Sequence, residues 1–301
     1  MLARQKERKT VKTYILYNPL AGQGTGKKKA EELAAAAEGE VTCADMTVCT
    51  DYAALFAKLG IGDRLILCGG DGTINRFVNA TEGMDIKCDV LYCAVGTGND
   101  FLKDLGKTEE CEPFSLLPYI KNLPFVEVNG EKCRFLNGVG FGIDGYCCEV
   151  GDALKASNPT KPVNYTGIAI KGLLFHFKPA NATVTVDGVS HTYKKVWIAA
   201  TMKGRYYGGG MMNAPAQDRL ADDGGVTLVL FHGKGRLKTL ITFPSIFKGE
   251  HVNHKEMVAV HTGKRIHVAF DAPAALQIDG ETRLGVREYT VTAGVMADVT
   301  V

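Results

Sequence analysis

Between Thr13 and Val95 the chain repeats one local pattern, a short apolar run followed by a loop and a helix-forming stretch. The expected strands are about Tyr14–Tyr17, Met46–Val48, Arg64–Cys68 and Val90–Val95, and the expected helices are Lys27–Ala37, Tyr52–Leu59 and Ile74–Asn79. Strands that alternate with helices at this spacing form a parallel sheet with helices packed on its faces. We therefore predict a Rossmann-like α/β domain whose ligand site lies at the carboxyl ends of the strands.

After about Pro124 the pattern is typical of antiparallel β structure. Val184–Trp197 is expected to form a hairpin about a two-residue turn, Asp187-Gly188. Further short strands are expected at Val226–Phe231, Arg265–Phe270, Leu276–Ile278 and Tyr289–Val291, with helical interruptions at Gly167–Phe177 and Arg236–Lys248. We predict an α/β domain over residues 1–130 and a mostly antiparallel β-sandwich over residues 131–301, whose last strand can return to the first domain.

Composition limits the functional class. Lys and Arg number 35 against 33 Asp and Glu, a net charge of +2, whereas a dedicated nucleic-acid binder normally has a strong basic excess. The nine cysteines have no Cys-x-x-Cys spacing, which disfavours a zinc site or a disulfide framework and favours a reducing cytosol. No apolar run approaches the ~20 residues that span a bilayer, and the N-terminus has no signal-peptide core. We expect a soluble cytoplasmic protein.

Three glycine-rich loops follow the expected strands, at Asn18–Gly24, Gly69–Thr73 and Gly96–Asp100. Glycine lets backbone amides approach an anion closely, and a helix N-terminus adds a favourable partial charge. Three such loops on one edge of a sheet predict a phosphate-bearing ligand. The first loop does not have P-loop spacing, because Ala21 stands where the first glycine belongs and Lys28 where Ser or Thr belongs.

Asp71 lies in the middle of the second loop. A carboxylate at about 4 Å from a phosphate is repelled by about 4 kcal/mol at an effective dielectric of about 20. Its presence suggests a divalent cation between the two groups, or a proton that the carboxylate handles. The alternative is an N-cap for the helix at Ile74, a task that Thr73 can also perform.

The segment Leu67–Asn75 resembles the nucleotide-binding signature of the diacylglycerol kinase catalytic-domain family, which includes soluble bacterial diacylglycerol kinases and sphingosine or ceramide kinases. Four further motifs resemble that family in the same order, at Asn18–Gly22, Gly96–Phe101, Asn137–Asp144 and Ile278–Glu281. The GGDGT segment alone is shared with NAD kinases, so the set of five motifs carries the specificity.

The resemblance implies an NAD-kinase-like first domain and a second domain for the lipid substrate, with ATP bound between them. The nucleotide contacts that it implies are Leu20, Ala21, Gly22, Gln23, Gly24, Gly69, Gly70, Asp71, Gly72, Thr73, Ile74, Asn75 and Thr97, with Thr50 in a looser register. The implied reaction moves the γ-phosphoryl group of ATP to a lipid hydroxyl, first of all that of diacylglycerol, to give phosphatidic acid.

Acidic residues of the second half complete the implied site. By spacing alone, Asp279-Gly280-Glu281 is a hairpin turn. The resemblance implies that its carboxylates face the γ-phosphate, so that Asp279 or Glu281 accepts the hydroxyl proton while Asp71 organises Mg²⁺. It also implies Mg²⁺ binding by Asp223 with the carbonyls of Leu220 and Gly225, for which the alternative is an exposed acidic turn.

A lipid substrate requires access to a bilayer. The segments Gly167–Phe177 and Arg236–Lys248 carry apolar residues edged by Lys and Arg, which suits a peripheral contact with the inner face of the membrane. The alternative for each is a helix that covers the β core. We expect His251 and His254 to be a solvated pair, and Met211-Met212 to line a lipid entrance or to pack in the core.

Two rival functions remain at this stage. One is an NAD kinase or a kinase of sphingoid or other lipids, and the other is a non-catalytic regulator that binds nucleotide or lipid. The cluster of acids at Asp71, Asp223, Asp279 and Glu281 disfavours a pure binding protein. The oligomeric state stays open, with a homodimer among the alternatives, and no nucleic-acid partner is expected.

Overall fold

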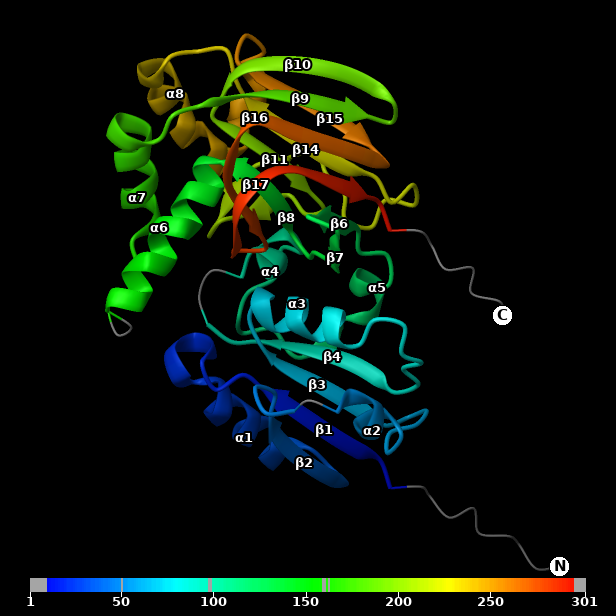
Figure 1. Ribbon diagram of the computed structural model, residues 1–301. Helices are drawn as coiled ribbons and strands as arrows, with labels where there is room; N and C mark the ends of the chain where they lie inside the picture. Colours follow the sequence, from blue (N-terminus) through cyan, green and yellow to red (C-terminus); the bar gives the residue numbers. More distant parts are fainter. Residues whose placement is uncertain (1–9, 50, 97–98, 159–160, 162, 295–301) are drawn as a thin grey trace, which may run out of the picture. The chain divides into compact units, whose positions relative to one another are not determined.

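A computed structural model describes residues 10–49, 51–96, 99–158, 161 and 163–294 (Figure 1). These residues form two compact units. The first lies within Met1–Gly98 and Lys107–Pro118, and the second lies within Asn99–Gly106 and Tyr119–Val301. The segment Asn99–Gly106 therefore belongs to the second unit, although both neighbouring segments belong to the first.

The first unit is built on a five-stranded sheet in the order β2-β1-β3-β4-β5. Its strands are β1 (Lys12–Tyr17), β2 (Glu40–Asp45), β3 (Arg64–Gly69), β4 (Asp89–Ala94) and β5 (Phe114–Ser115). The first four are parallel, and β5 joins β4 antiparallel. Three α-helices connect them: α1 (Gly26–Ala36), α2 (Tyr52–Phe56) and α3 (Asp71–Ala80). The predicted α/β fold class is confirmed.

The second strand was predicted in the wrong place. Met46–Val48 forms the turn after β2, in which the Thr47 amide donates to Asp45 at 2.7 Å. The strand itself, Glu40–Asp45, lies at the sheet edge with no fully buried residue. Met46 is buried in the turn, 1% exposed, so the most deeply buried apolar side chain of this region lies after the strand and not in it.

The second unit contains a ten-stranded antiparallel sheet. Its main path is β15-β14-β11-β8-β16-β17-β6-β7, and the β9–β10 hairpin joins through β16. The strands are β6 (Phe125–Val128), β7 (Glu131–Arg134), β8 (Gly138–Gly142), β9 (Ala180–Val186), β10 (Val189–Val196), β11 (Ile198–Met202), β14 (Val226–Phe231), β15 (Val258–Gly263), β16 (Arg265–Ile278) and β17 (Glu281–Thr292). A separate pair is formed by β12 (Tyr206–Tyr207) and β13 (Met211–Met212).

Strand β14 shows how this sheet forms two cores. All six of its residues are buried. Val226, Leu228 and Leu230 pack into the core between the β layers. Val229 and Phe231 point to the other face, where helical segments cover them. Because side chains alternate along a strand, an uninterrupted apolar run marks a strand that is covered on both faces.

Strand β16 passes from one layer of this unit to the other. Its first half pairs with β9 and its last three residues pair with β8, with register shifts between Ala269 and Leu276. The two short strands predicted here are parts of this one long strand. The predicted hairpin is confirmed: Asp187 and Gly188 both have positive φ, 47° and 89°, as a type I′ turn requires.

The helices of the second unit are α4 (Asp100–Asp104), α6 (Ile143–Ser157), α7 (Tyr165–Lys171) and α8 (Arg236–Thr242), and α5 (Leu117–Ile120) lies at the boundary of the two units. A π-helical turn, η2 (Gly172–His176), follows α7, and a 3₁₀ segment, η3 (Phe243–Lys248), follows α8. None of the helices in the described ranges is long and apolar enough to cross a bilayer. Strand β17 pairs with β16 and β6; residues 295–301, on which the predicted return of the chain depends, lie outside the described residues.

Candidate active site

One group of candidate site residues lies in the first unit, where the sheet of that unit reverses its strand order. Strand β1 is flanked by β2 on one side and by β3 on the other. The connections that leave β1 and β3 therefore diverge, and ligands of open α/β sheets bind in the crevice at such a reversal. The first two predicted glycine loops follow these two strands, and the third follows β4.

Gly22 and Gly96 bring the first and third loops into direct contact. A Cβ on Gly96 would lie 2.7 Å from the Gly22 Cα, and a Cβ on Gly22 would lie 2.9 Å from Val95 Cγ1. Both glycines have positive φ, 56° and 93°. Any other residue at either position would force the two loops apart, so glycine here serves a close backbone approach.

The second loop packs equally tightly against its helix. A Cβ on Gly69 would lie 2.1 Å from the Thr73 Oγ1, and Asn18 Nδ2 of the first loop donates to the same oxygen at 3.3 Å. The buried Tyr92 hydroxyl donates to the Gly69 carbonyl at 2.8 Å. The three loops are thus held together at one end of the sheet, with the N-terminus of α3 among them.

Asp71 is the first residue of α3, three positions before the predicted start, and Gly70 is the N-cap. The alternative that Asp71 or Thr73 caps this helix is wrong, because α3 has no side-chain cap and Thr73 is buried inside it. A carboxylate in the first turn is favoured by the helix dipole. Burial raises the pKa of Tyr92, and the nearby charge of Asp71 raises it further.

The predicted nucleotide contacts differ in what they can offer. Leu20 is 81% exposed, whereas the Ile74 side chain is fully buried in the core and has only its backbone to contribute. Ala21, Gly24, Gly72 and Asn75 lie on the same loops and first helical turns. Thr50, Thr97 and the side chain of Gln23 lie outside the described residues.

A second group of candidate site residues, in the second unit, is the turn between β16 and β17. Asp279 and Gly280 both have positive φ, 47° and 89°. One Asp279 oxygen accepts hydrogen bonds from the amides of Asn137 at 2.8 Å and Gly138 at 3.0 Å, and the other accepts from Leu136 at 2.5 Å. Three backbone donors fix the position of this carboxylate.

Glu281 has the opposite environment. It is the first residue of β17 and is exposed. Within the described part of the chain its carboxylate has neither a hydrogen-bond donor nor an ion-pair partner. Of the two acids that the sequence left equivalent, Asp279 is held by the fold and Glu281 is accessible.

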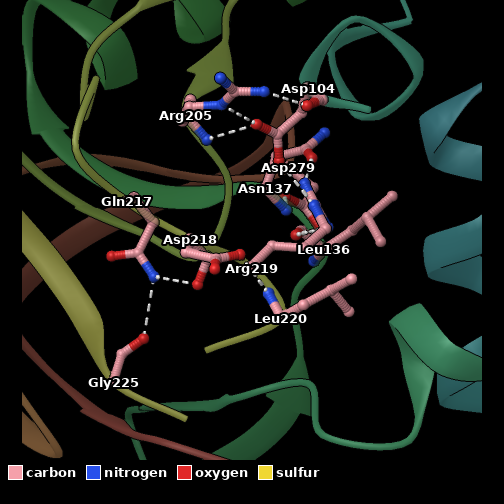
Figure 2. Close-up of polar contacts among 10 residues, drawn as sticks. All are labelled: Asp104, Leu136, Asn137, Arg205, Gln217, Asp218, Arg219, Leu220, Gly225 and Asp279. Carbon is pink, nitrogen blue, oxygen red and sulfur yellow. Dashed lines mark hydrogen bonds and ion pairs between the residues drawn. The ribbon is translucent and has the colours of Figure 1, made fainter. Parts of the chain in front are cut away.

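A buried ion cluster, shown in Figure 2, supports the Asp279 turn. Arg219 Nε contacts Asp104 Oδ2 at 2.6 Å, and its two terminal nitrogens donate to Leu136 O at 3.1 Å and to Asn137 Oδ1 at 2.8 Å. The side chains of Arg219 and Asp104 are 2% and 4% exposed. Arg205, 38% exposed, binds the second Asp104 oxygen at 2.8 Å. Arg219 thus connects α4 to the residues whose amides hold Asp279.

Sequence reasoning missed this cluster and two further buried carboxyl groups. Burial raises the pKa of Asp100 to about 6, against hydrogen bonds from Gly209 and Gly210, and the charge of Asp279 adds to the rise. Burial raises the pKa of Asp144 to about 7, although it accepts a hydrogen bond from the Tyr207 hydroxyl at 2.7 Å. Asp100 belongs to the motif Gly96–Phe101, and Asp144 belongs to the motif Asn137–Asp144. Membership in these motifs was the sequence signal that could have identified both carboxyl groups.

The predicted magnesium loop offers only oxygen atoms as metal ligands. Asp223 is exposed and accepts the Gly225 amide at 3.1 Å, while the Gly225 carbonyl accepts from Gln217 Nε2 at 3.0 Å and keeps a second lone pair. Leu220 is 51% exposed. The described chain has no cluster of three His, Cys, Asp or Glu side chains that could hold a metal. One carboxylate and two carbonyls fit a hard cation that keeps most of its water ligands.

His251 is not solvated, which corrects the prediction for His251 and His254. It is fully buried, its ring stacks on Phe231 at 5.4 Å, and its Nε2 lies 2.9 Å from the Asn213 carbonyl oxygen. Burial lowers its pKa to about 4. Met211 packs against the core beneath the helical segments, which favours the packing alternative for Met211-Met212.

Comparisons with known proteins agree with this architecture. The family model for the diacylglycerol kinase catalytic domain matches residues 12–120, and that for the YegS C-terminal NAD kinase beta sandwich-like domain matches residues 137–294. The chain is 27% identical over 269 residues to a diacylglycerol kinase of Mycobacterium tuberculosis, covering 85% of this chain and 84% of that protein. It is 26% identical over 279 residues to a diacylglycerol kinase of Bacillus subtilis, covering 89% and 88%.

The fold also has solved counterparts. The crystal structure of a diacylglycerol kinase from Bacillus anthracis superposes with a TM-score of 0.58 at 20% identity, covering 95% of each chain. The β-sandwich family model alone covers more than half of the present chain, and the catalytic-domain model covers most of the remainder. The chain therefore belongs to the diacylglycerol kinase family with a YegS-like C-terminal domain, and it is a lipid kinase.

Proposed function

We propose that this lipid kinase transfers the γ-phosphoryl group of ATP to the hydroxyl group of diacylglycerol, giving phosphatidic acid. The observation that supports the phosphate chemistry is the convergence of three glycine loops at the strand-order reversal of the first unit. The choice of diacylglycerol follows the names of relatives at 26–27% identity. In a cell the enzyme would act from the cytoplasm on the inner face of the membrane.

For the nucleotide, the proposed ligands are the backbone amides of Leu20–Gly24 and Gly69–Asn75, with Thr50 and Thr97. Gly22, Gly24 and Gly96 have positive φ, which lets the peptide groups of the first and third loops turn toward an anion. The N-terminus of α3 adds its partial positive charge. These groups would bind and orient the phosphates.

For the proton, we assign the acceptor role to Glu281 and a positioning role to Asp279. A general base must reach the hydroxyl proton, and three amide hydrogen bonds hold the Asp279 carboxylate against residues 136–138. Glu281 is exposed one residue after the rigid Asp279-Gly280 turn. The turn then fixes the backbone of Glu281, and its exposed side chain would reach the substrate hydroxyl.

For the metal, each unit offers its own group of residues. Asp71 of the first unit would organise Mg²⁺ at the phosphates, and Asp223 of the second unit, with the carbonyls of Leu220 and Gly225, would hold Mg²⁺ in its own loop. A bound Mg²⁺ would neutralise charge that develops on the transferred phosphoryl group. Asp71 then tolerates a neighbouring phosphate, because the cation offsets their repulsion.

The test offers the full chain γ-labelled ATP and Mg²⁺ with diacylglycerol, sphingosine, ceramide, undecaprenol and NAD in parallel. Label in phosphatidic acid alone supports the proposal, and label in another lipid would change the substrate. Label in NAD alone would overturn the lipid reaction. No transfer to any acceptor, together with tight ATP binding, would favour a regulatory binding protein. Replacing Mg²⁺ by EDTA is the control for the metal.

A further inference from the structure

Lys203 is a buried lysine that the proposed reaction does not use. Its side chain is 2% exposed. Within the described residues its ammonium group has neither a hydrogen-bond acceptor nor an ion-pair partner. Lysine is almost never fully buried unless its charge is compensated, because an isolated ammonium loses the water that stabilises it. The fold therefore has to supply negative charge near this ammonium.

The backbone places Lys203 at the end of the loop formed by residues 217–225. Lys203 follows β11, whose last residue, Met202, pairs with Thr227 of β14. The loop enters β14 at Val226, so Lys203 lies beside this junction. Met202 packs beneath the helical segments, whereas Val226 packs between the β layers. Because side chains alternate along a strand, Lys203 lies on the same face as Val226.

Asn137 holds both Lys203 and the loop. Its carbonyl accepts hydrogen bonds from the amides of Lys203 at 2.9 Å and Gly204 at 3.2 Å. Its side-chain oxygen accepts from Arg219 of the loop at 2.8 Å. Figure 2 shows Arg219, between Asp218 and Leu220 in sequence, extending from the loop to Asn137. The backbone of Lys203 therefore does not move independently of the loop.

The acids of the loop act on this ammonium. Burial and the charge of Arg219 lower the pKa of Lys203, whereas the charges of Asp223 and Asp218 raise it. Both acids are exposed, and the lysine is buried next to them. Arg219 is already paired with Asp104 at 2.6 Å. Of these two cations, Lys203 is thus the one left to offset the loop acids.

We propose that Lys203 sets the Mg²⁺ affinity of the 217–225 loop, because its ammonium already supplies part of the charge that a bound cation would supply. The proposal rests on the proposed role of Asp223 as a Mg²⁺ ligand. Like charges repel, so an ammonium beside the site weakens Mg²⁺ binding. The same charge stabilises the loop when Mg²⁺ is absent, because it offsets the repulsion between Asp218 and Asp223. Lys203 is therefore a positioning residue for the metal loop.

The direct test is calorimetric titration of the full chain with MgCl₂, without nucleotide or lipid and at constant ionic strength. Lys203→Met removes the charge but keeps a side chain of similar length, and it is expected to tighten Mg²⁺ binding by about ten-fold or more. Lys203→Arg keeps the charge and is expected to stay within about two-fold of the wild type. Both variants are measured on the intact protein.

The matched control is Lys194→Met. Lys194 is exposed and lies near the other end of β14, where its carbonyl accepts the Gly233 amide at 2.8 Å. A charge at that distance is screened by salt, so Mg²⁺ affinity is expected to stay within about two-fold of the wild type. An equal gain in Lys194→Met and Lys203→Met would overturn the proposal, because the effect would then follow from net charge alone.

A second measurement is urea unfolding followed by the fluorescence of Trp197, which lies in the second unit with the loop. In Lys203→Met the acids of the loop lose their counter-charge, so Mg²⁺ should raise the urea midpoint more than it does in the wild type. Lys203→Gln gives the same comparison if Lys203→Met folds poorly. A midpoint that responds equally to Mg²⁺ in the wild type and in the neutral variants would contradict the proposal.

Asp223→Asn separates the failure of this inference from the failure of the metal assignment. Added to Lys203→Met, it should remove the gained Mg²⁺ binding, and a gain that survives would overturn the proposal. Equal or weaker binding in Lys203→Met that Asp223→Asn abolishes would refute the role of Lys203 and leave the metal loop intact. No Mg²⁺ binding by any variant would refute the metal assignment of Asp223 and the role of Lys203 with it. These outcomes do not depend on which lipid is phosphorylated.

Discussion

The buried pair of Arg219 and Asp104 gives the sharpest prediction of stability. Replacing Arg219 with Met removes its 2.6 Å contact with Asp104 and the donors to Leu136 O and Asn137 Oδ1. Breaking a buried ion pair from one side costs about 3–5 kcal/mol, because the remaining charge stays buried. Arg205 continues to neutralise Asp104, so we expect the lower end, about 3 kcal/mol.

The assay is urea unfolding at fixed pH, followed by the fluorescence of Trp197. Trp197 is the only tryptophan of the chain, is 2% exposed and lies in the second unit, so its signal reports unfolding of that unit. The matched variant is Arg205→Met, which removes a 38% exposed partner of the same carboxylate and should cost about 1 kcal/mol or less. Arg219→Lys should fall between the two, because a single ammonium cannot reproduce the three-way fork.

Comparing Arg219→Met with Arg205→Met tests whether burial determines the cost of breaking this ion pair. A loss below about 1 kcal/mol for Arg219→Met, or equal losses for Arg219→Met and Arg205→Met, would refute the argument from burial. Enzyme activity gives a second readout for the positioning role of Arg219. In Arg219→Met the amides that hold Asp279 lose their support, so kcat should fall at temperatures where the protein is still folded.

Three further predictions follow from the described geometry. Glu281→Gln should lower kcat by about 100-fold or more with unchanged unfolding, whereas Asp279→Asn should lower both kcat and stability; the reverse pattern in steady-state kinetics and urea unfolding would exchange their roles. Gly96→Ala should weaken ATP binding measured by calorimetry, because its Cβ would meet the neighbouring loop at 2.7 Å, whereas Gly62→Ala has similar φ (87°), open space around it and no such effect. Burial raises the pKa of Asp144 to about 7, above its unfolded value, so stability present below about pH 4 is lost as pH rises toward 7, and Asp144→Asn should flatten that slope in unfolding titrations.

Local signals predicted local structure well. The Asp187-Gly188 turn needs two residues with positive φ, and the adjacent pair Asp-Gly in the sequence indicates such a turn directly. The glycine loops were found for the same reason, because close backbone approach demands glycine at specific positions such as Gly22. The position predicted for strand β2 is wrong because an edge strand with no fully buried residue carries only a weak apolar pattern.

The parts that escaped prediction depend on distant partners. Arg219 and Asp104 are 115 residues apart in sequence. No local sequence pattern around either residue predicts that the two pair. The prediction that His251 is solvated is wrong because its ring stack on Phe231 and its contact with Asn213 arise only from the packing of the second unit. Strand β16 was predicted as two strands because its bulged middle, which crosses between layers, is half-exposed.

The excursion Asn99–Gly106 determines how this enzyme can be dissected. A fragment ending near residue 130 would carry α4 away from the second unit, leaving Phe101 and Leu102, 0% and 2% exposed in the intact chain, without their burial. Asp104 would lose both arginines in the same cut. Expression of the nucleotide half alone should therefore give aggregation unless residues 99–106 are exchanged for a short polar linker. The third glycine motif begins in the first unit and ends in the second. A cut of the chain at this boundary would therefore divide a motif to which both units contribute residues.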